Sequence, residues 1–114
     1  EFLYTAVNEY FCMRLAQELG LQVPKVSLII NNYVTFVVER YDRIVAEDGS
    51  LKSLHQEDFC QALSVIPDMK YENEGGPSLK NCFDRLKTVS IDFEADKKQF
   101  LLWIFYNYLI GNAD

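Results

Sequence analysis

The sequence has few of the side chains from which metal and nucleophile sites are built. Its 114 residues contain one histidine, His55, and three cysteines, with no C-x-x-C pair. No serine or cysteine lies in a motif with the histidine, so nothing supports a nucleophilic triad. A zinc site made of the thiols and His55 would lack the paired ligand spacing that such sites use. The odd number and wide spacing of the cysteines instead indicate reduced thiols and predict a cytoplasmic protein.

Positive charge and long apolar runs are also scarce. Lysine and arginine number 11 against 17 acidic residues, the net charge is −6, and no basic cluster is longer than Lys97-Lys98. A direct nucleic-acid surface is therefore not expected. The apolar run at 100–110 is interrupted by Asn107 and is shorter than the roughly 20 residues that span a membrane. We expect neither nucleic acid nor a membrane as a direct partner.

The composition does supply material for a core. Hydrophobic residues make up 49% of the chain and aromatic residues 14%, which is typical of a globular protein and not of a disordered one. A chain of 114 residues is one small domain or a piece of a larger one.

The first part of the chain predicts a helix followed by a β-hairpin. Apolar residues recur at helical spacing over 4–19, namely Tyr4, Val7, Phe11, Cys12, Leu15 and Leu19. Gly20 is the expected stop of this helix, and Pro24 prevents its continuation. Residues 25–40 are rich in β-branched and aromatic residues, and Asn31-Asn32 predicts a two-residue turn with positive φ angles.

The rest of the chain predicts mainly helices. Residues 44–53 indicate a loop or short hairpin around Asp48-Gly49, and 67–77 an irregular segment. Helices are expected at about 56–65, 78–87 and 94–110. The first should carry Gln56, Glu57 and Asp58 in its first turn, and the inward residues of the first two should be Phe59, Leu63, Ile66, Leu79, Cys82, Phe83 and Leu86. The last helix is apolar almost all round and should lie at the centre of a helical layer.

This order of elements predicts an α+β fold with an unusual weakness. Two strands alone make a poor independent sheet. The hairpin should therefore be the edge of something larger, or a partner should cover it.

The charged stretch that follows the second strand, residues 37–43, has two interpretations. It is either a strand end with solvated charges or a hinge between two lobes. In a hinge, the unpaired backbone groups of the outgoing strand could bind a flat heterocycle such as adenine.

Two carboxylates also have two interpretations each. Asp114 follows the break at Gly111, so it is either part of a polar tail after a helix cap or a general base that accepts a proton from a hydroxyl. Glu9 is either an exposed helix carboxylate or a glutamate that pairs with a strand lysine to position phosphates. No lysine precedes Glu9 in this sequence.

Several stretches, taken together and in order, resemble the HipA family of serine/threonine kinases. They are 8–16 (NEYFCMRLA), 18–21 (ELGL), 23–24 (VP), 38–43 (VERYDR), 55–63 (HQEDFCQAL), 70–77 (KYENEGGP) and 107–114 (NYLIGNAD). The likeness covers nearly the whole chain and is weakest at 44–53 and 88–98.

The resemblance implies a fragment of a two-lobed protein-kinase-like fold, with 1–41 as the remnant of the N-lobe and 42–114 as the front of a helical C-lobe. It implies ATP and magnesium as cofactors. The cofactor-binding residues would be Glu9 of the regulatory helix and Glu39, Arg40 and Tyr41 of the hinge. Asp114 falls on the catalytic aspartate of the family.

The resemblance further implies the toxin of a bacterial toxin–antitoxin system. Such kinases are held by a DNA-binding antitoxin, and their known substrates are aminoacyl-tRNA synthetases. The Gly-rich phosphate loop, its lysine and the metal-binding residues should lie outside this sequence. We therefore expect the chain alone to be inactive.

Two other functions stay open on the sequence. One is a non-catalytic α+β interaction module, whose hairpin edge and aromatic helix face bind a partner. The other is a small-molecule phosphotransferase on a kinase-like fold.

Overall fold

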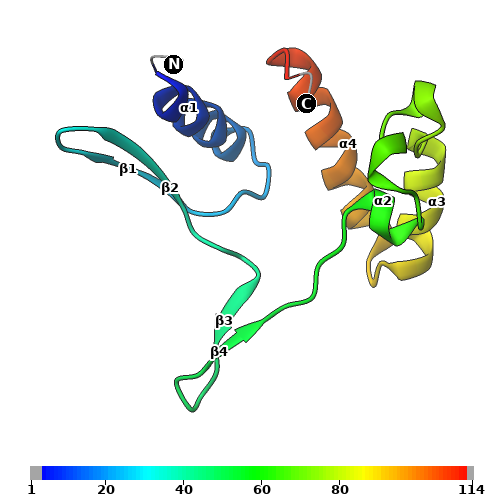
Figure 1. Ribbon diagram of the computed structural model, residues 1–114, viewed down its shortest axis with the longest axis horizontal. Helices are drawn as coiled ribbons and strands as arrows, with labels where there is room; N and C mark the ends of the chain where they lie inside the picture. Colours follow the sequence, from blue (N-terminus) through cyan, green and yellow to red (C-terminus); the bar gives the residue numbers. More distant parts are fainter. Residues whose placement is uncertain (1–3, 113–114) are drawn as a thin grey trace.

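The computed structural model describes residues 4–112, which form an α+β chain. In order, the elements are α1 (Thr5–Glu18), β1 (Val26–Ile30), β2 (Val34–Val38), β3 (Arg43–Val45), β4 (Leu51–Ser53), α2 (Phe59–Ala62), η1 (Pro67–Met69), η2 (Glu72–Glu74), α3 (Leu79–Val89) and α4 (Phe93–Leu109). Figure 1 shows α4 between α1, with its neighbouring hairpin, and the pair α2 and α3. The expected α+β class is confirmed, with helices and small antiparallel hairpins.

The strands form two separate two-stranded antiparallel sheets, β1–β2 and β3–β4. In the first sheet Ile30 pairs with Val34, so the loop has three residues, 31–33, and the expected two-residue turn is wrong. The expected positive φ is also absent, since neither Asn31 nor Asn32 has one. The reason is local: the Asn31 side-chain oxygen accepts a hydrogen bond from the Tyr33 N–H at 3.0 Å, and this closes the loop.

The second sheet confirms the short hairpin expected at 44–53. Its turn contains Gly49 with φ +79°, a conformation that glycine adopts without steric cost. The Asp48 carboxylate accepts hydrogen bonds from the backbone and hydroxyl of Ser50, and these bonds lower the pKa of Asp48.

Helix α1 packs against β1 and β2 and also against α4. The buried centre is Ala16, Leu21 and Tyr106, with Leu15, Val23, Leu102 and Trp103 packed around it. Most of the expected apolar stripe is not buried, because Tyr4, Val7, Phe11 and Leu19 are exposed. The face that the helix buries is set by its neighbours, and residues 4–112 provide no cover for the other face.

Helix α2 is shorter than expected and begins later. Asp58 is its N-cap: the carboxylate accepts from the Gln61 N–H at 2.7 Å, while the Gln61 side chain accepts from the Asp58 N–H. Gln56 and Glu57 therefore precede the helix. Ile66 lies after α2 and is exposed, against the expectation that it is buried.

Helix α3 has an equivalent capping box between Ser78 and Asn81. Cys82 is buried as expected, but Leu79 is half exposed, against expectation. The ring of Phe100 on α4 contacts Phe59 of α2 and Phe83 of α3, with ring centroids 5.1 Å apart in both pairs. These contacts join the three helices.

Helix α4 does not lie at the centre of a covered layer in the described chain. Phe105, Tyr108 and Leu109 are 62%, 81% and 78% exposed. The accessible surface is 9488 Å², whereas a compact protein of this mass has about 6,500 Å². The radius of gyration is 16.8 Å, against about 13 Å for a compact chain of this length. The chain therefore exposes much of the apolar surface that its composition supplies.

Among residues 4–112, no helix combines the length and the apolar character that crossing a membrane requires.

Candidate active site

A groove of about 520 Å³ lies between the first half of α1 and the end of α4. Asn8, Glu9, Cys12 and Met13 line it from one side, and Ile110, Gly111 and Asn112 from the other. Glu9 is exposed. The groove brings one of the predicted site residues, Glu9, to the segment that leads to Asp114. Asp114 itself lies outside the described residues.

The end of α4 is shaped by Gly111. This residue has φ +70°, its N–H donates to the Tyr108 carbonyl, and the Asn112 N–H donates to the Asn107 carbonyl. These two bonds form a Schellman motif, which satisfies the last carbonyls of a helix and turns the chain sharply. The glycine stop that the sequence predicts is therefore confirmed, and it lies at the groove.

One hydrogen bond fixes α1 on α4 beside the groove. The Tyr106 hydroxyl donates to the carbonyl of Cys12 at 2.5 Å, and Tyr106 is only 5% exposed. Burial raises the pKa of Tyr106, so the phenol stays neutral and keeps its proton to donate. Cys12 lines the groove, so this bond holds one wall of the groove against α4.

The described part of the chain contains no group of three or more His, Cys, Asp or Glu side chains that could hold a metal ion. Of the groove residues, only Glu9 carries a carboxylate. The described residues alone therefore do not fit a magnesium site.

The predicted hinge, residues 39–41, leaves β2 as an exposed connector. The Glu39 N–H donates to the Lys25 carbonyl at 2.9 Å, which extends the pairing beyond β1. Among residues 4–112, neither the Glu39 carbonyl nor the Tyr41 N–H has a hydrogen-bond partner. The connector therefore presents an acceptor and a donor on one short stretch of backbone.

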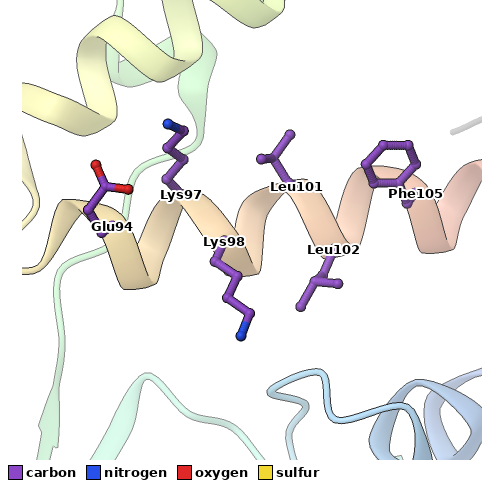
Figure 2. Close-up of a pocket in the computed structure, with 6 residues that line it drawn as sticks. All are labelled: Glu94, Lys97, Lys98, Leu101, Leu102 and Phe105. Atoms are coloured by element: carbon purple, nitrogen blue, oxygen red, sulfur yellow. The ribbon is translucent and has the colours of Figure 1, made fainter.

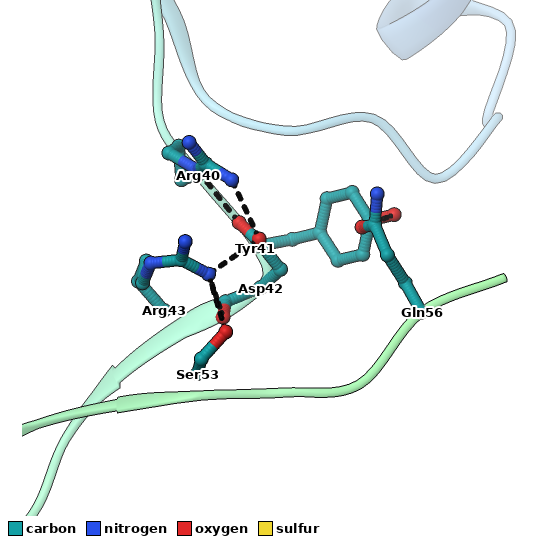
Figure 3. Close-up of polar contacts among 6 residues, drawn as sticks. All are labelled: Arg40, Tyr41, Asp42, Arg43, Ser53 and Gln56. Atoms are coloured by element: carbon teal, nitrogen blue, oxygen red, sulfur yellow. Dashed lines mark hydrogen bonds and ion pairs between the residues drawn. The ribbon is translucent and has the colours of Figure 1, made fainter.

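The connector is held by a cluster that the sequence did not reveal, shown in Figure 3. Asp42 is only 6% exposed. Its carboxylate accepts from Nε and Nη2 of Arg40 at 2.8 and 2.7 Å and from Nη1 of Arg43 at 2.6 Å. The hydrogen bonds from Arg40 lower the pKa of Asp42 to about 2, and Asp42 in turn raises the pKa of Arg40. The Arg40 guanidinium is thus engaged with Asp42.

Tyr41 extends away from this cluster. Its hydroxyl donates to the Gln56 side-chain oxygen at 2.5 Å, and the ring lies on the opposite side of the connector from the two arginines (Figure 3). The sequence did not single out Asp42, because it is one of several charged residues in a row. Only its burial distinguishes it, and that burial depends on the fold.

A second hollow, of about 290 Å³, lies along α4 alone. Figure 2 shows Lys98 and Leu102 on one side of the helix, and Lys97, Leu101 and Phe105 on the other. Because all its lining residues come from one helix, it is a shallow exposed surface, and it contains none of the predicted site residues.

These features define an α+β chain in which a helix and hairpin pack on a helical part, with a charged connector between them. The family model described as HipA-like C-terminal domain matches residues 1–114. The chain belongs to this family.

Relatives named as kinases match nearly all of the chain. A Sinorhizobium fredii protein named "Putative kinase Y4mE" is 48% identical over 111 residues, which is 96% of this chain and 26% of that protein. The "Serine/threonine-protein kinase toxin HipA" of Shewanella oneidensis is 34% identical over 127 residues, covering 100% of this chain and 29% of that protein. The chain therefore spans between a quarter and a third of the length of these relatives.

A solved structure has the same fold. It is described as the Shewanella oneidensis MR-1 toxin–antitoxin system HipA, HipB and operator DNA complex. The match has a TM-score of 0.79 and 31% identity, and covers 100% of this chain and 30% of that chain.

Proposed function

We propose that this chain is the central part of a serine/threonine protein kinase that transfers the γ-phosphoryl group of ATP to a protein hydroxyl, as the toxin of a toxin–antitoxin pair. Family membership supports the kinase class. Residues 1–41 would belong to the N-lobe. Residues 42–114 would form the front of the helical C-lobe. ATP and magnesium would be required by the complete protein.

The groove between α1 and α4 carries this proposal. It unites Glu9 with residues 110–112, the last of which lies two positions before Asp114. A carboxylate that follows a tightly capped helix has a rigid support, as a general base needs. Asp114 would orient the substrate hydroxyl and accept its proton. The hydroxyl oxygen forms a bond to the γ-phosphorus as the bond from that phosphorus to the β-phosphate oxygen breaks, and ADP leaves.

The exposed connector would bind the adenine. The Glu39 carbonyl would accept from the exocyclic amine, and the Tyr41 N–H would donate to a ring nitrogen, since neither group has a partner among residues 4–112. Because these are backbone groups, the side chain of Glu39 should contribute little to nucleotide affinity. Arg40, which pairs with Asp42, would support the connector instead of contacting the nucleotide with its paired nitrogens.

The test is Asp114→Asn in the complete protein, with radiolabelled ATP and phosphorylation of protein as the assay. General-base catalysis typically contributes about 10²–10⁴-fold in rate, so the variant should lose at least about 99% of the activity. Affinity for an ATP analogue and the melting temperature should stay near those of the unchanged protein.

Asp84→Asn is the matched control. Asp84 is an exposed carboxylate on α3 that pairs with Lys80, and its loss should leave the rate unchanged. If Asp114→Asn keeps more than about a tenth of the rate, the general-base role is wrong. If it loses its fold, Asp114 is part of a structural cap.

The partners would follow from the same family. The structurally similar HipA is in complex with HipB and operator DNA, which supports a DNA-binding antitoxin as a partner of the complete protein. The substrate would be a protein in the cytoplasm, and an aminoacyl-tRNA synthetase is the candidate.

The exposed apolar residues of the hairpin and α4 favour a second candidate, a non-catalytic interaction module. Saturable ATP turnover by the complete protein would exclude it.

A further inference from the structure

Asp42 contacts residues at the ends of both hairpins. Its carboxylate binds Arg40 on the β2 side and Arg43 at the start of β3. Its carbonyl accepts from the N–H of Leu54, just after β4, at 2.8 Å. The Nη1 of Arg43 also donates to the Ser53 hydroxyl at 2.7 Å. One residue thus joins β2, β3 and the end of β4.

These contacts constrain the connector without occupying its free backbone groups. The arginines lie on one side of the chain and the Tyr41 ring on the other (Figure 3). Rotation of the backbone between residues 40 and 43 would break the bidentate bond to Arg40 or the bond to Arg43. Meanwhile the Glu39 carbonyl and the Tyr41 N–H stay unpaired among residues 4–112.

We propose that Asp42 is a positioning residue for nucleotide binding: by holding Arg40 and Arg43 together, it keeps the Glu39–Tyr41 backbone in the conformation that receives adenine. This inference rests on the proposed kinase function. It assigns Asp42 no contact with the nucleotide.

The cluster is suited to local ordering more than to global stability. The side chains of Arg40 and Arg43 are 65% and 38% exposed. Solvent therefore screens the arginine side of both ion pairs, which limits their contribution to the free energy of unfolding although Asp42 itself is buried. The buried core lies elsewhere, around Ala16 and Tyr106. Loss of Asp42 should therefore free the connector while the fold persists.

The effect on binding follows from populations. A nucleotide that binds only the ordered connector has an apparent Kd equal to its intrinsic Kd divided by the fraction of ordered molecules. If the freed connector is ordered about a tenth of the time, the Kd rises roughly tenfold. The chemical step, once nucleotide is bound, should not change.

The experiment uses the complete protein and Asp42→Asn, an isosteric change that removes the charge. Calorimetric titration with a non-hydrolysable ATP analogue should give a Kd about tenfold higher than that of the unchanged protein. The KM for ATP should rise by a similar factor, and kcat at saturating ATP should stay the same. Asp84→Asn, which removes an exposed paired carboxylate on α3, should change neither quantity.

Arg43→Gln provides a second variant should Asp42→Asn fail to fold. It removes one partner of Asp42 and the bond to Ser53, and it should also raise the Kd. In the double variant the effects should not add, because both changes release the same cluster.

The outcomes separate the inference from the proposed function. If the unchanged protein binds no ATP analogue, the proposed function is wrong, and the inference is overturned with it. If the unchanged protein binds but both variants stay within twofold of it, only the inference is overturned. The same holds if kcat falls while the Kd stays constant.

Discussion

The hydrogen bond from Tyr106 to the Cys12 carbonyl should hold α1 against α4, and Tyr106→Phe removes it while keeping the ring. The ring contributes an edge contact to Trp103, with centroids 5.9 Å apart, and lies in the buried cluster with Ala16. Phenylalanine preserves both, so the change isolates the hydroxyl.

The expected loss is about 1 kcal/mol in the free energy of holding α1 on α4. A typical intramolecular hydrogen bond contributes about 0.5–1.5 kcal/mol net. The upper end is not expected, because Cys12 lies inside α1, where its carbonyl also has a helical partner in the next turn. Tyr106→Ala would add the loss of a buried ring, about 3–5 kcal/mol by comparison with other aromatic residues.

Native-state hydrogen exchange of the complete protein measures this local opening. The α1 amides near Cys12 and Ala16 should exchange about fivefold faster in Tyr106→Phe, as 1 kcal/mol requires. Tyr108→Phe is the control, because the side chain of Tyr108 is 81% exposed. Equal exchange in the two variants would mean that the bond does not hold the helices together.

Two further predictions concern the loop after α2 and the connector. Gly76→Ala should destabilise the complete protein by about 1–3 kcal/mol in urea unfolding, because the new Cβ would lie 2.4 Å from the Met69 carbonyl oxygen. The exposed Asn73→Ala should stay within about 0.5 kcal/mol, and equal midpoints would refute the clash. For the connector, the pKa of Asp42 is lowered from 3.8 to about 2 in the folded protein. The stabilisation that Asp42 provides is therefore complete above the pKa of the unfolded state, and it is lost as the pH falls through the pKa of the folded state. The Kd ratio of Asp42→Asn to the unchanged protein should therefore be constant from about pH 5 to 8, and a ratio that falls within that range would show that another group titrates.

Local signals predicted well the places where one residue determines the backbone. Gly111 ends α4 with the motif that its lack of a side chain permits, and the order of helices and hairpins is also confirmed. The turn at Asn31 was wrong although it is local, because two outcomes compete there. An asparagine can adopt positive φ, or its side chain can accept a hydrogen bond two residues on, and here the second occurs.

The candidate site could be predicted only in part, because it depends on contacts between distant residues. Glu9 and Asn112 are 103 positions apart in the sequence and meet only because α1 docks on α4. Burial of Asp42 likewise depends on how the two hairpins are placed. The roles of Glu9, Glu39, Arg40, Tyr41 and Asp114 stay predictions.

The apolar character of α4 shows how a correct pattern can lead to a wrong position. The residues of this helix are hydrophobic almost all round, which indicates burial on all sides. In the described chain, however, its last two turns expose Phe105, Tyr108 and Leu109. The accessible surface exceeds that of a compact protein of this mass by about 3,000 Å², more than the roughly 1,600 Å² that a standard protein interface buries from both partners together. A surface of that size and character is suited to burial by further protein. The relatives, of which this chain spans about a quarter to a third, are long enough to supply such cover from their own chains.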